Sequence, residues 1–292
     1  MRERLAGWAS GIERELAGFC EPEGPEYERF ANMLRYGLLG GGKRLRGGLL
    51  LAAYGAMGGD DLDGEALRFA AALECVHAFS LIHDDLPSMD NAAERRGKPS
   101  HHMVYGEGMS VLSGDALLAI AAERMLDMTA KAVDPIRVRR RVGASLAVTR
   151  SAGTRGIALG QFMDLEGTRS PRWMGGGVGG RAALLADIDQ RKTAEMFRAA
   201  LEAGFTLAGA EDWEIAAAVS FGLKLGMLFQ IRDDIQDVGA DEGMVTWPAV
   251  HGLDESKRRA DALERGALSD LGKLGGRGLP LAEFAEMMRG FS

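Results

Sequence analysis

Apolar side chains recur along most of this chain at intervals of three and four residues, and strand-like alternation is hard to find. This spacing is typical of helices with one buried face, because 3.6 residues make one turn. Alanine, leucine, methionine, glutamate and arginine, which favour helices, dominate the sequence. The pattern predicts helices at residues 3–19, 25–38, 41–58, 64–85, 108–130, 135–165, 182–208, 212–238, 254–269 and 280–289.

Some of these helices are apolar around most of their circumference, which suits a helix enclosed by others. No change of composition, charged linker or repeat divides the sequence. We therefore predict an all-α protein with a single domain, residues 1–292. The glycine-rich stretch 172–183 follows no strand and lacks the end of a phosphate-binding P-loop, so it is interpreted as a surface loop.

Composition and charge exclude several partners. Of the 292 residues, 46% are apolar and 26% charged, which is enough for a sizeable core. The net charge of −7 and the lack of a basic stripe argue against nucleic acid, because binding it needs clustered Lys and Arg.

The two cysteines, Cys20 and Cys75, are too few for a disulfide framework and favour a cytoplasmic protein with reduced thiols. No apolar stretch approaches the roughly 20 residues that cross a bilayer, so no membrane span is expected.

Carboxylates gather at the end of the predicted helix 64–85, where Asp84, Asp85 and Asp90 fall within seven residues. His77 precedes Asp84 by seven residues, nearly two turns, so both lie on one face about 10 Å apart. Pro87 is expected to end or turn the chain and to bring Asp90 back toward the same place.

In two further segments, small residues, an amide and acids recur at helical spacing and form a stripe along one face. The first stripe contains Gly222, Gly226, Gln230, Asp233 or Asp234, and Asp237. The second contains Gly153, Gly156, Gly160, Gln161 and Asp164. We interpret the glycines as leaving room for a ligand, with the acids clustered at one end of that room.

A lone pair of aspartates is most often a solvated helix end, but two clusters of three that share one cavity require cations. Two like charges 4 Å apart cost on the order of 4 kcal/mol at an effective dielectric of 20. Mg²⁺ meets this need, since it binds through one or two carboxylates and substrate phosphates. Zinc is disfavoured because Cys75 and His77 are the only cysteine and histidine close together in the sequence, without two further soft ligands clustered beside them.

Basic residues form three groups that would complement such a metal site. They are Lys43, Arg44 and Arg46; Arg95, Arg96 and Lys98; and Arg191 and Lys192 with Thr193. Each group alone is most often a solvated patch. Together with the acids they indicate two diphosphates above an apolar pocket, one bound through metal and one bound directly.

The chain resembles the trans-type polyprenyl (isoprenyl) diphosphate synthases, and within them the bacterial farnesyl diphosphate synthases. The resemblance covers about residues 28–252 and rests on motifs in the family's order. These are GGGKRLR, ECVHAFSLIHDDLPSMDN, RRGKP, GDALL, GQFMDLEG, KTAEMF and FQIRDDIQD. It implies a bundle of long helices around a deep central cavity, a homodimer, and three Mg²⁺ ions bound with substrate diphosphate.

The resemblance also implies a role for each matching residue. Asp84, Asp90 and Asp233 match Mg²⁺ ligands, Asp85 supports the first pair, and Asp234 and Asp237 lie close to the third ion. Lys43, Arg46, His77 and Arg96 match the metal-free site for isopentenyl diphosphate. Arg95, Lys192, Thr193 and Gln230 match positions that hold the allylic diphosphate or its departing charge.

The reaction that the resemblance implies needs no nucleophilic side chain. Diphosphate leaves the allylic carbon when its charge is neutralised, and the double bond of isopentenyl diphosphate attacks the resulting cation. Phe79, five residues before Asp84, stands where short-product members carry an aromatic pocket floor, so farnesyl diphosphate is the expected product. Spacing alone does not prove that Phe79 faces the prenyl tail, because it lies about 140° from Asp84 around the helix.

The chain departs from the family's pattern in two places. Met244, Val245 and Thr246 stand where a loop with diphosphate-binding lysines usually ends, and Asn91 to Glu94 replace an acidic run with leucine. We expect weakened capture of metal and diphosphate. A geranyl or geranylgeranyl diphosphate synthase and a weakly active or regulatory partner subunit therefore stay open as alternatives.

Two other enzyme classes fit less well. A terpene cyclase would carry an Asn/Ser/Glu metal motif where DDIQD stands. A His-Asp metal phosphohydrolase would need more histidines than the five present.

Overall fold

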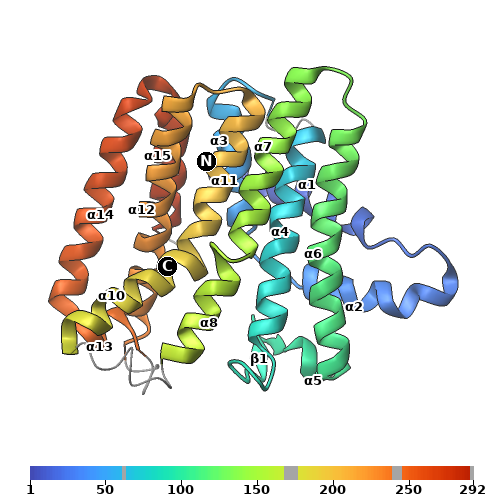
Figure 1. The fold of residues 1–292 in the computed structure, drawn as a ribbon, viewed down its shortest axis with the longest axis horizontal. Coiled ribbons are helices and arrows are strands. Elements are labelled where there is room, and N and C mark those ends of the chain that lie inside the picture. The colour runs from blue at the N-terminus through green and yellow to red at the C-terminus, as the bar shows by residue number, and fades with distance from the viewer. Residues whose placement is uncertain (61–63, 168–176, 239–244, 290–292) are drawn as a thin grey trace.

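The structure, a computed structural model, describes residues 1–60, 64–167, 177–238 and 245–289 as a bundle of long helices (Figure 1). The helices are α1 (Arg2–Phe19), α2 (Glu28–Leu38), α3 (Leu45–Ala56), α4 (Gly64–Asp84), α5 (His101–Tyr105), α6 (Glu107–Ala130), α7 (Pro135–Ala152), α8 (Ile157–Gly167), α10 (Gly177–Asp189), α11 (Glu195–Ala208), α12 (Asp212–Gln236), α13 (Trp247–His251), α14 (Leu253–Lys273) and α15 (Leu279–Met288). Two short 3₁₀ turns, Pro25–Tyr27 and Gly275–Gly278, and a π-helical turn, Gln190–Ala194, join them. The predicted all-α class is confirmed.

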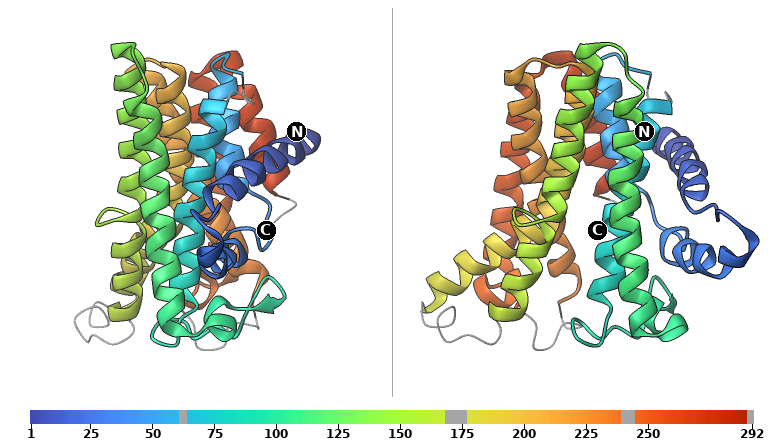
Figure 2. Two further views of the ribbon diagram at one scale, coloured as in Figure 1. Left: turned by 90° about the vertical axis from the view of Figure 1, so that its right-hand side faces the viewer. Right: turned by 45° about the vertical axis from the view of Figure 1, so that its right-hand side comes forward.

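The core lies where α3, α4 and α11 pack against one another inside the bundle. Helix α4 is buried along most of its length, as its nearly continuous apolar sequence predicts. Helices α1 and α2 lie on the outside of the bundle, and the left view of Figure 2 shows them crossing in front of the long helices. Neighbouring helices therefore cover α4 on several sides, and Asp84 ends it.

The predicted helix 135–165 is wrong as one helix. Helix α7 ends at Ala152 and α8 begins at Ile157, with Gly153 and Gly156 in the connection. A Cβ atom on Gly156 would collide with the backbone of Ser151, so this tight turn requires glycine. The two glycines thus end a helix that the apolar periodicity alone would continue.

The predicted helix 182–208 is interrupted in the same way. Helix α10 ends at Asp189, the π-helical turn Gln190–Ala194 follows, and α11 starts at Glu195. Such turns are rare inside helices and are frequent at functional sites. The loop predicted at 172–183 is wrong for residues 177–183, which belong to α10, and its other residues lie outside the described ranges.

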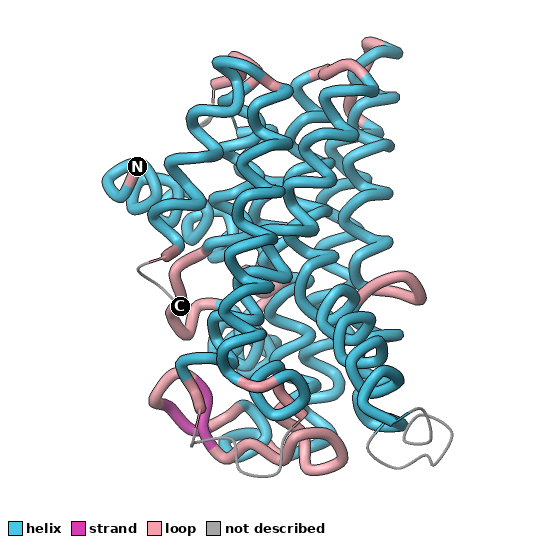
Figure 3. Tube along the Cα trace, turned by 90° about the vertical axis from the view of Figure 1, so that its left-hand side faces the viewer, coloured by secondary structure: helices cyan, strands magenta, loops and turns pink. Residues whose placement is uncertain are grey.

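A two-stranded hairpin was not predicted. It pairs β1 (Glu94–Arg95) with β2 (Lys98–Pro99) and lies among loops at one end of the bundle (Figure 3). Its two central residues, Arg96 and Gly97, have φ of +55° and +71°, which is typical of the tight turns that match strand twist. Runs of two residues are too short for periodicity to detect.

Two described helices, α4 and α12, are long and apolar enough to cross a membrane by length and composition. The expectation that no apolar stretch reaches that length was therefore too strict. In the bundle, 78% of the apolar window of α4 and 50% of that of α12 are buried. Burial against neighbouring helices accounts for much of their apolar composition.

Candidate active site

The acidic end of α12 and Asp90, which follows α4, line one cavity of about 580 Å³, which we call the acidic cavity. It lies where α8, α10 and α12 approach one another, in the lower part of Figure 1. Its acids are Asp90, Asp164, Asp189, Asp233, Asp234 and Asp237. Its other polar residues are Arg95, Lys192, Thr193, Gln230 and Thr246, and its apolar residues are Leu165, Leu185, Ile188 and Val245. Asp90 of the first aspartate cluster therefore shares this cavity with Asp233, Asp234 and Asp237 of the second.

Asp84 lies at the end of α4, beside this cavity, with only 9% of the residue exposed. Burial raises the pKa of its carboxyl to about 6, and Asp90 adds to the shift while Lys192 opposes it. The backbone N–H of Asp90 donates to the carbonyl of Asp84 at 2.9 Å. This bond closes the turn around Pro87 and brings Asp90 back toward Asp84, as predicted.

Asp85 is buried and accepts from the Arg95 guanidinium, whose Nε lies 3.0 Å from Oδ1. Arg95 comes from strand β1, so this ion pair fixes the hairpin to the end of α4. Support of the metal ions by Asp85 and direct ligation of a metal by it both stay predictions.

The π-helical turn presents Lys192 and Thr193 to the cavity. The Lys192 Nζ lies 3.0 Å from Oδ2 of Asp164 on α8, and Thr193 Oγ1 donates to Oε1 of Gln230 at 2.9 Å. Burial alone would lower the pKa of Lys192, but the nearby carboxylates of Asp84 and Asp164 raise it above its ordinary value. Lys192 is therefore charged at neutral pH and ready to meet an anion.

Gly226 and Gly160 of the predicted stripes lie against protein backbone, which corrects the interpretation that they leave room for a ligand. A Cβ on Gly226 would lie 2.5 Å from the Ala194 Cα, and one on Gly160 would lie 2.7 Å from the Lys192 nitrogen. These glycines let α12 and α8 approach the π-helical turn from two sides. The absence of side chains makes room for protein backbone, and this close packing positions Lys192.

A second cavity of about 580 Å³, which we call the basic pocket, lies beside the N-terminal end of α3. It is lined by Gly42, Lys43, Arg44, Leu45, Arg46, Glu74, His77, Arg96 and Phe229. The four residues predicted to bind isopentenyl diphosphate therefore share one pocket, although they come from three separate segments.

Arg46 and His77 contact each other directly within this pocket. The Arg46 NH1 lies 3.1 Å from His77 Nε2, and the Arg46 Cζ lies 5.4 Å from the centre of the Phe197 ring. Burial, reinforced by the Arg46 charge, lowers the pKa of His77 well below its ordinary value. A neutral His77 accepts from Arg46 through Nε2 and leaves its other ring nitrogen as a donor.

Sequence reasoning missed the role of Glu74 and placed Arg44 only in a basic group. Arg44 has φ of +51°, is 4% exposed, and donates to the Leu38 carbonyl at 2.8 Å. Glu74, also buried, accepts from the Gly47 N–H at 2.8 Å and lies 3.8 Å from Arg44. These contacts hold the loop before α3 and the first turn of α3 against α4. An acid inside an otherwise apolar helix was the available signal.

The hairpin divides its two arginines between the two cavities. Arg95 lines the acidic cavity and Arg96 lines the basic pocket, where its guanidinium donates to the Gly41 carbonyl. Gly42 beside this guanidinium has a φ of +126°, a backbone conformation that favours glycine. The resemblance implies that Arg95 binds the allylic diphosphate and Arg96 binds isopentenyl diphosphate. The placement of the two arginines in different cavities is compatible with these roles.

Phe79 points to another part of the bundle. Its ring packs edge-on against His83 at 5.8 Å, and His83 Nε2 donates to the Val111 carbonyl of α6 at 3.1 Å. Phe79 is partly buried against the core and does not line the described acidic cavity or basic pocket. Its role as a pocket floor stays a prediction.

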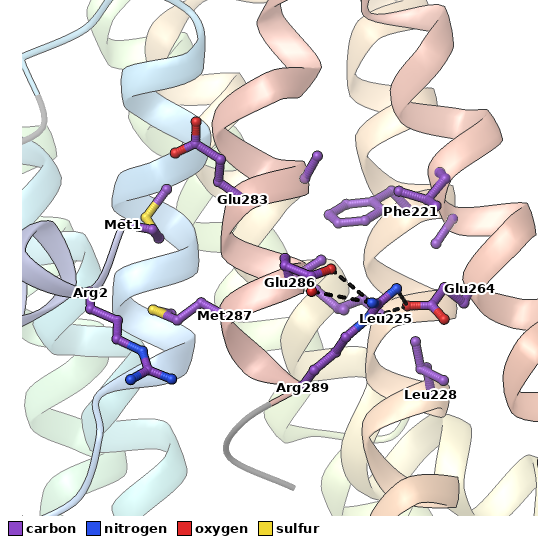
Figure 4. Close-up of a pocket in the computed structure, with 14 residues that line it drawn as sticks. Met1, Arg2, Phe221, Leu225, Leu228, Glu264, Glu283, Glu286, Met287 and Arg289 are labelled. Carbon is purple, nitrogen blue, oxygen red and sulfur yellow. Dashed lines mark hydrogen bonds and ion pairs between the residues drawn. The ribbon is translucent and has the colours of Figure 1, made fainter.

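A groove of about 710 Å³ lies away from both cavities, between α12, α14 and α15 (Figure 4). Phe221, Leu225 and Leu228 form its apolar side, and Arg289 bridges Glu264 and Glu286 at its edge. None of the predicted site residues lines it, so it is no part of the candidate active site.

The donor set of the acidic cavity fits Mg²⁺. Six aspartates among the described residues line this cavity, and their carboxylates are the hard oxygen donors that Mg²⁺ prefers. No described histidine or cysteine lines it. No three of the described acids, histidines and cysteines gather closely enough to enclose an ion. Carboxylates on facing walls suit ions that complete their coordination with water and substrate phosphate.

The all-helical bundle with two opposed carboxylate clusters defines the class of isoprenoid synthases. The apo structure of a farnesyl/geranylfarnesyl diphosphate (FPP/GFPP) synthase from Zymomonas mobilis has this fold, with a TM-score of 0.86 and 32% identity over 99% of both chains.

This chain belongs to the polyprenyl synthetase family, whose family model matches residues 27–267. It is 37% identical over 253 residues to farnesyl diphosphate synthase of Geobacillus stearothermophilus, covering 85% of this chain and 78% of the relative. It is 41% identical over 252 residues to geranylgeranyl pyrophosphate synthase 3 of Arabidopsis thaliana, covering 82% and 67%. The chain is a short-chain trans-prenyltransferase.

Proposed function

We propose that this enzyme condenses isopentenyl diphosphate with dimethylallyl or geranyl diphosphate and that its main product is farnesyl diphosphate. The observation that carries the proposal is the pair of cavities with opposite charge, separated by the hairpin that sends Arg95 to one and Arg96 to the other. One diphosphate needs a metal between itself and the carboxylates, and the other meets Lys and Arg directly.

In the acidic cavity Asp84, Asp90 and Asp233 would hold up to three Mg²⁺ ions with the allylic diphosphate. The ions supply charge neutralisation for the departing diphosphate. Lys192 and Arg95 place two further positive charges at the cavity, and Thr193 and Gln230 add polar contacts there. Leu185 and Ile188 in the lining reduce the access of water to an allylic cation.

In the basic pocket Lys43, Arg46 and Arg96 provide three positive charges for the diphosphate of isopentenyl diphosphate. His77 adds a neutral donor from α4, the helix that also carries Asp84. Because both ligands meet the same helix, their reacting carbons are held near each other. The proton lost after condensation has the released diphosphate as its acceptor.

The purified chain with Mg²⁺, isopentenyl diphosphate and an allylic diphosphate tests this proposal, with products separated by length. We expect products of fifteen carbons, and absence of any Mg²⁺-dependent condensation would refute it. Relatives with farnesyl and geranylgeranyl names are similarly distant, so Phe79 is the residue to change. Phe79→Ala is expected to lengthen the products, whereas Phe30→Ala, at an exposed site on α2, is expected to leave them unchanged.

A catalytically weak partner subunit is the second candidate. Val245 and Thr246, which carry no charge, line the acidic cavity where the family usually has a lysine-bearing loop. Met244 and the rest of residues 239–244 lie outside the described ranges. If the chain alone gives no turnover but gives turnover with a second prenyl synthase, the subunit role is favoured.

We also propose a homodimer in the cytoplasm. Large apolar side chains are exposed along α5, α6, α7 and α8, as expected of a face that a second copy covers. They are Met103, Val104, Met109, Val111, Leu112, Leu118, Leu126, Ile136, Val142, Leu146 and Phe162. A mass in solution of twice 31.2 kDa would support the dimer, and Leu112→Glu is expected to give the mass of one chain.

A further inference from the structure

Trp247, at the start of α13, is held firmly behind the acidic cavity. The residue is 3% exposed, its ring stacks on His251 at 4.9 Å, and the Arg259 Cζ lies 5.4 Å from the ring centre. It directly follows Val245 and Thr246, which line the cavity. The packing on both sides fixes the direction of the indole N–H.

Both N–H groups of Trp247 donate to carboxylates of the acidic cavity. The backbone N–H donates to Oδ2 of Asp234 at 2.9 Å, and the indole Nε1 donates to Oδ2 of Asp189 at 2.6 Å. Asp189 ends α10 and Asp234 lies in the last turn of α12, so one residue joins acids from two helices. The other Asp234 oxygen accepts from Gln230 Nε2 at 2.9 Å.

Trp247 contacts this pair of acids through uncharged groups. Asp85 and Asp164 each contact a charged partner, Arg95 or Lys192, which neutralises them. The two bonds from Trp247 to Asp189 and Asp234 come from neutral N–H groups. A neutral donor orients a carboxylate and leaves its negative charge available to a cation.

We propose that Trp247 is a positioning residue that fixes Asp189 and Asp234 so that carboxylates of α10 and α12 face a metal-bound diphosphate in the acidic cavity. Asp189 thereby becomes a further acid of the site, beyond the two aspartate motifs. The inference deepens the proposed function and rests on it.

Binding of inorganic diphosphate in the presence of Mg²⁺, measured by calorimetry, tests this role without turnover. Trp247→Phe keeps the backbone N–H and the ring packing and removes only the indole donor. We expect about a ten-fold or greater loss of affinity, the range for a hydrogen bond to a charged group. Asp189→Asn should cause a similar loss, and the double variant should lose little more, because both changes remove one interaction.

Trp213→Phe is the matched control, since Trp213 is exposed near the opposite end of α12 and should leave the affinity unchanged. The KM for isopentenyl diphosphate should stay within about two-fold in Trp247→Phe, because the indole does not reach the basic pocket.

Unchanged diphosphate affinity in a folded Trp247→Phe would overturn the inference. Equal losses in both pockets with a lowered melting temperature would also overturn it, since they indicate a purely structural role. If the wild-type chain binds no Mg²⁺-diphosphate, the proposed function itself fails, and the inference fails with it.

Discussion

The acidic cavity and the basic pocket have the same volume, about 580 Å³ each, but they are prepared for their ligands in different ways. In the basic pocket Arg96 contacts a carbonyl and Arg46 contacts a neutral imidazole, so the charge of these two arginines remains available to an anion. In the acidic cavity the carboxylates outnumber the cations among the described residues. One pocket is complementary to a diphosphate as it stands, and the other becomes so only with added cations.

The largest expected effect follows from removing one acid of the second cluster. Asp233→Asn takes away a predicted metal ligand and should lower kcat/KM by on the order of 10²–10³-fold, as for the loss of one preorganised charge contact. The KM for isopentenyl diphosphate should change little, because the basic pocket is intact. Steady-state kinetics with each substrate varied separately measures both.

Asp212→Asn, the same change near the other end of α12, is the control and should retain full activity. If Asp233→Asn kept wild-type kcat/KM, the acidic cavity would not be the metal site.

The acidic cavity and the basic pocket should also differ in how they change the stability of the protein with pH. Burial raises the pKa of Asp189 from 3.8 to about 7 in the folded chain, with Asp234 adding to the shift. An acid with a raised pKa contributes stability below about pH 4, and this contribution is lost as the pH rises through about 7. The metal-free protein should therefore carry a penalty of a few kcal/mol at pH 8, at 1.36 kcal/mol per unit.

Asp189→Asn removes that penalty, so its free energy of unfolding relative to wild type should increase from pH 5 to pH 8 in chelator. Denaturant titrations at both pH values measure this difference. Burial lowers the pKa of His77 well below its ordinary value, so its imidazole is neutral at pH 8 and adds no such penalty to the basic pocket there. A pH-independent difference between wild type and Asp189→Asn would show that the Asp189 carboxyl is not perturbed.

The neighbouring arginines offer a sharper test of the separation between the regions. Arg95→Gln should raise the KM for the allylic diphosphate, and Arg96→Gln should raise the KM for isopentenyl diphosphate, each by about ten-fold. Each variant serves as the control for the other, since the change is the same and the positions are adjacent. Equal effects of both variants on both substrates would contradict the division made by the hairpin.

The smallest expected effect concerns packing between the regions. Gly226→Ala places a Cβ atom 2.5 Å from the Ala194 Cα, so α12 must shift away from the π-helical turn. We expect about 1–3 kcal/mol of destabilisation, as for overpacking in a core. Gly272→Ala, on α14 with nothing within 4 Å, should be neutral or slightly stabilising in the same denaturant titration.

Much of the fold and part of the site could be predicted from the sequence. The ends of α4 and α12 agree with the predicted helices within two residues, because their apolar periodicity is long and is followed by clear polar motifs. The break at Gly153 and Gly156 and the π-helical turn were missed, since apolar residues continue on both sides. The glycine stripe was recognised, but its purpose was misjudged, because a sequence does not show what a missing side chain makes room for.

The sequence by itself determined the helical class of this protein and the chemistry of its motifs, because periodicity and side-chain type are local properties. Only the tertiary structure decided which residues share a cavity. In the folded chain Arg95 and Arg96 line different cavities, and Glu74 binds the first turn of α3. Trp247 contacts Asp189, which is 58 residues earlier in the chain. The physical reason is that such contacts arise only when distant helices pack, and packing depends on the whole chain.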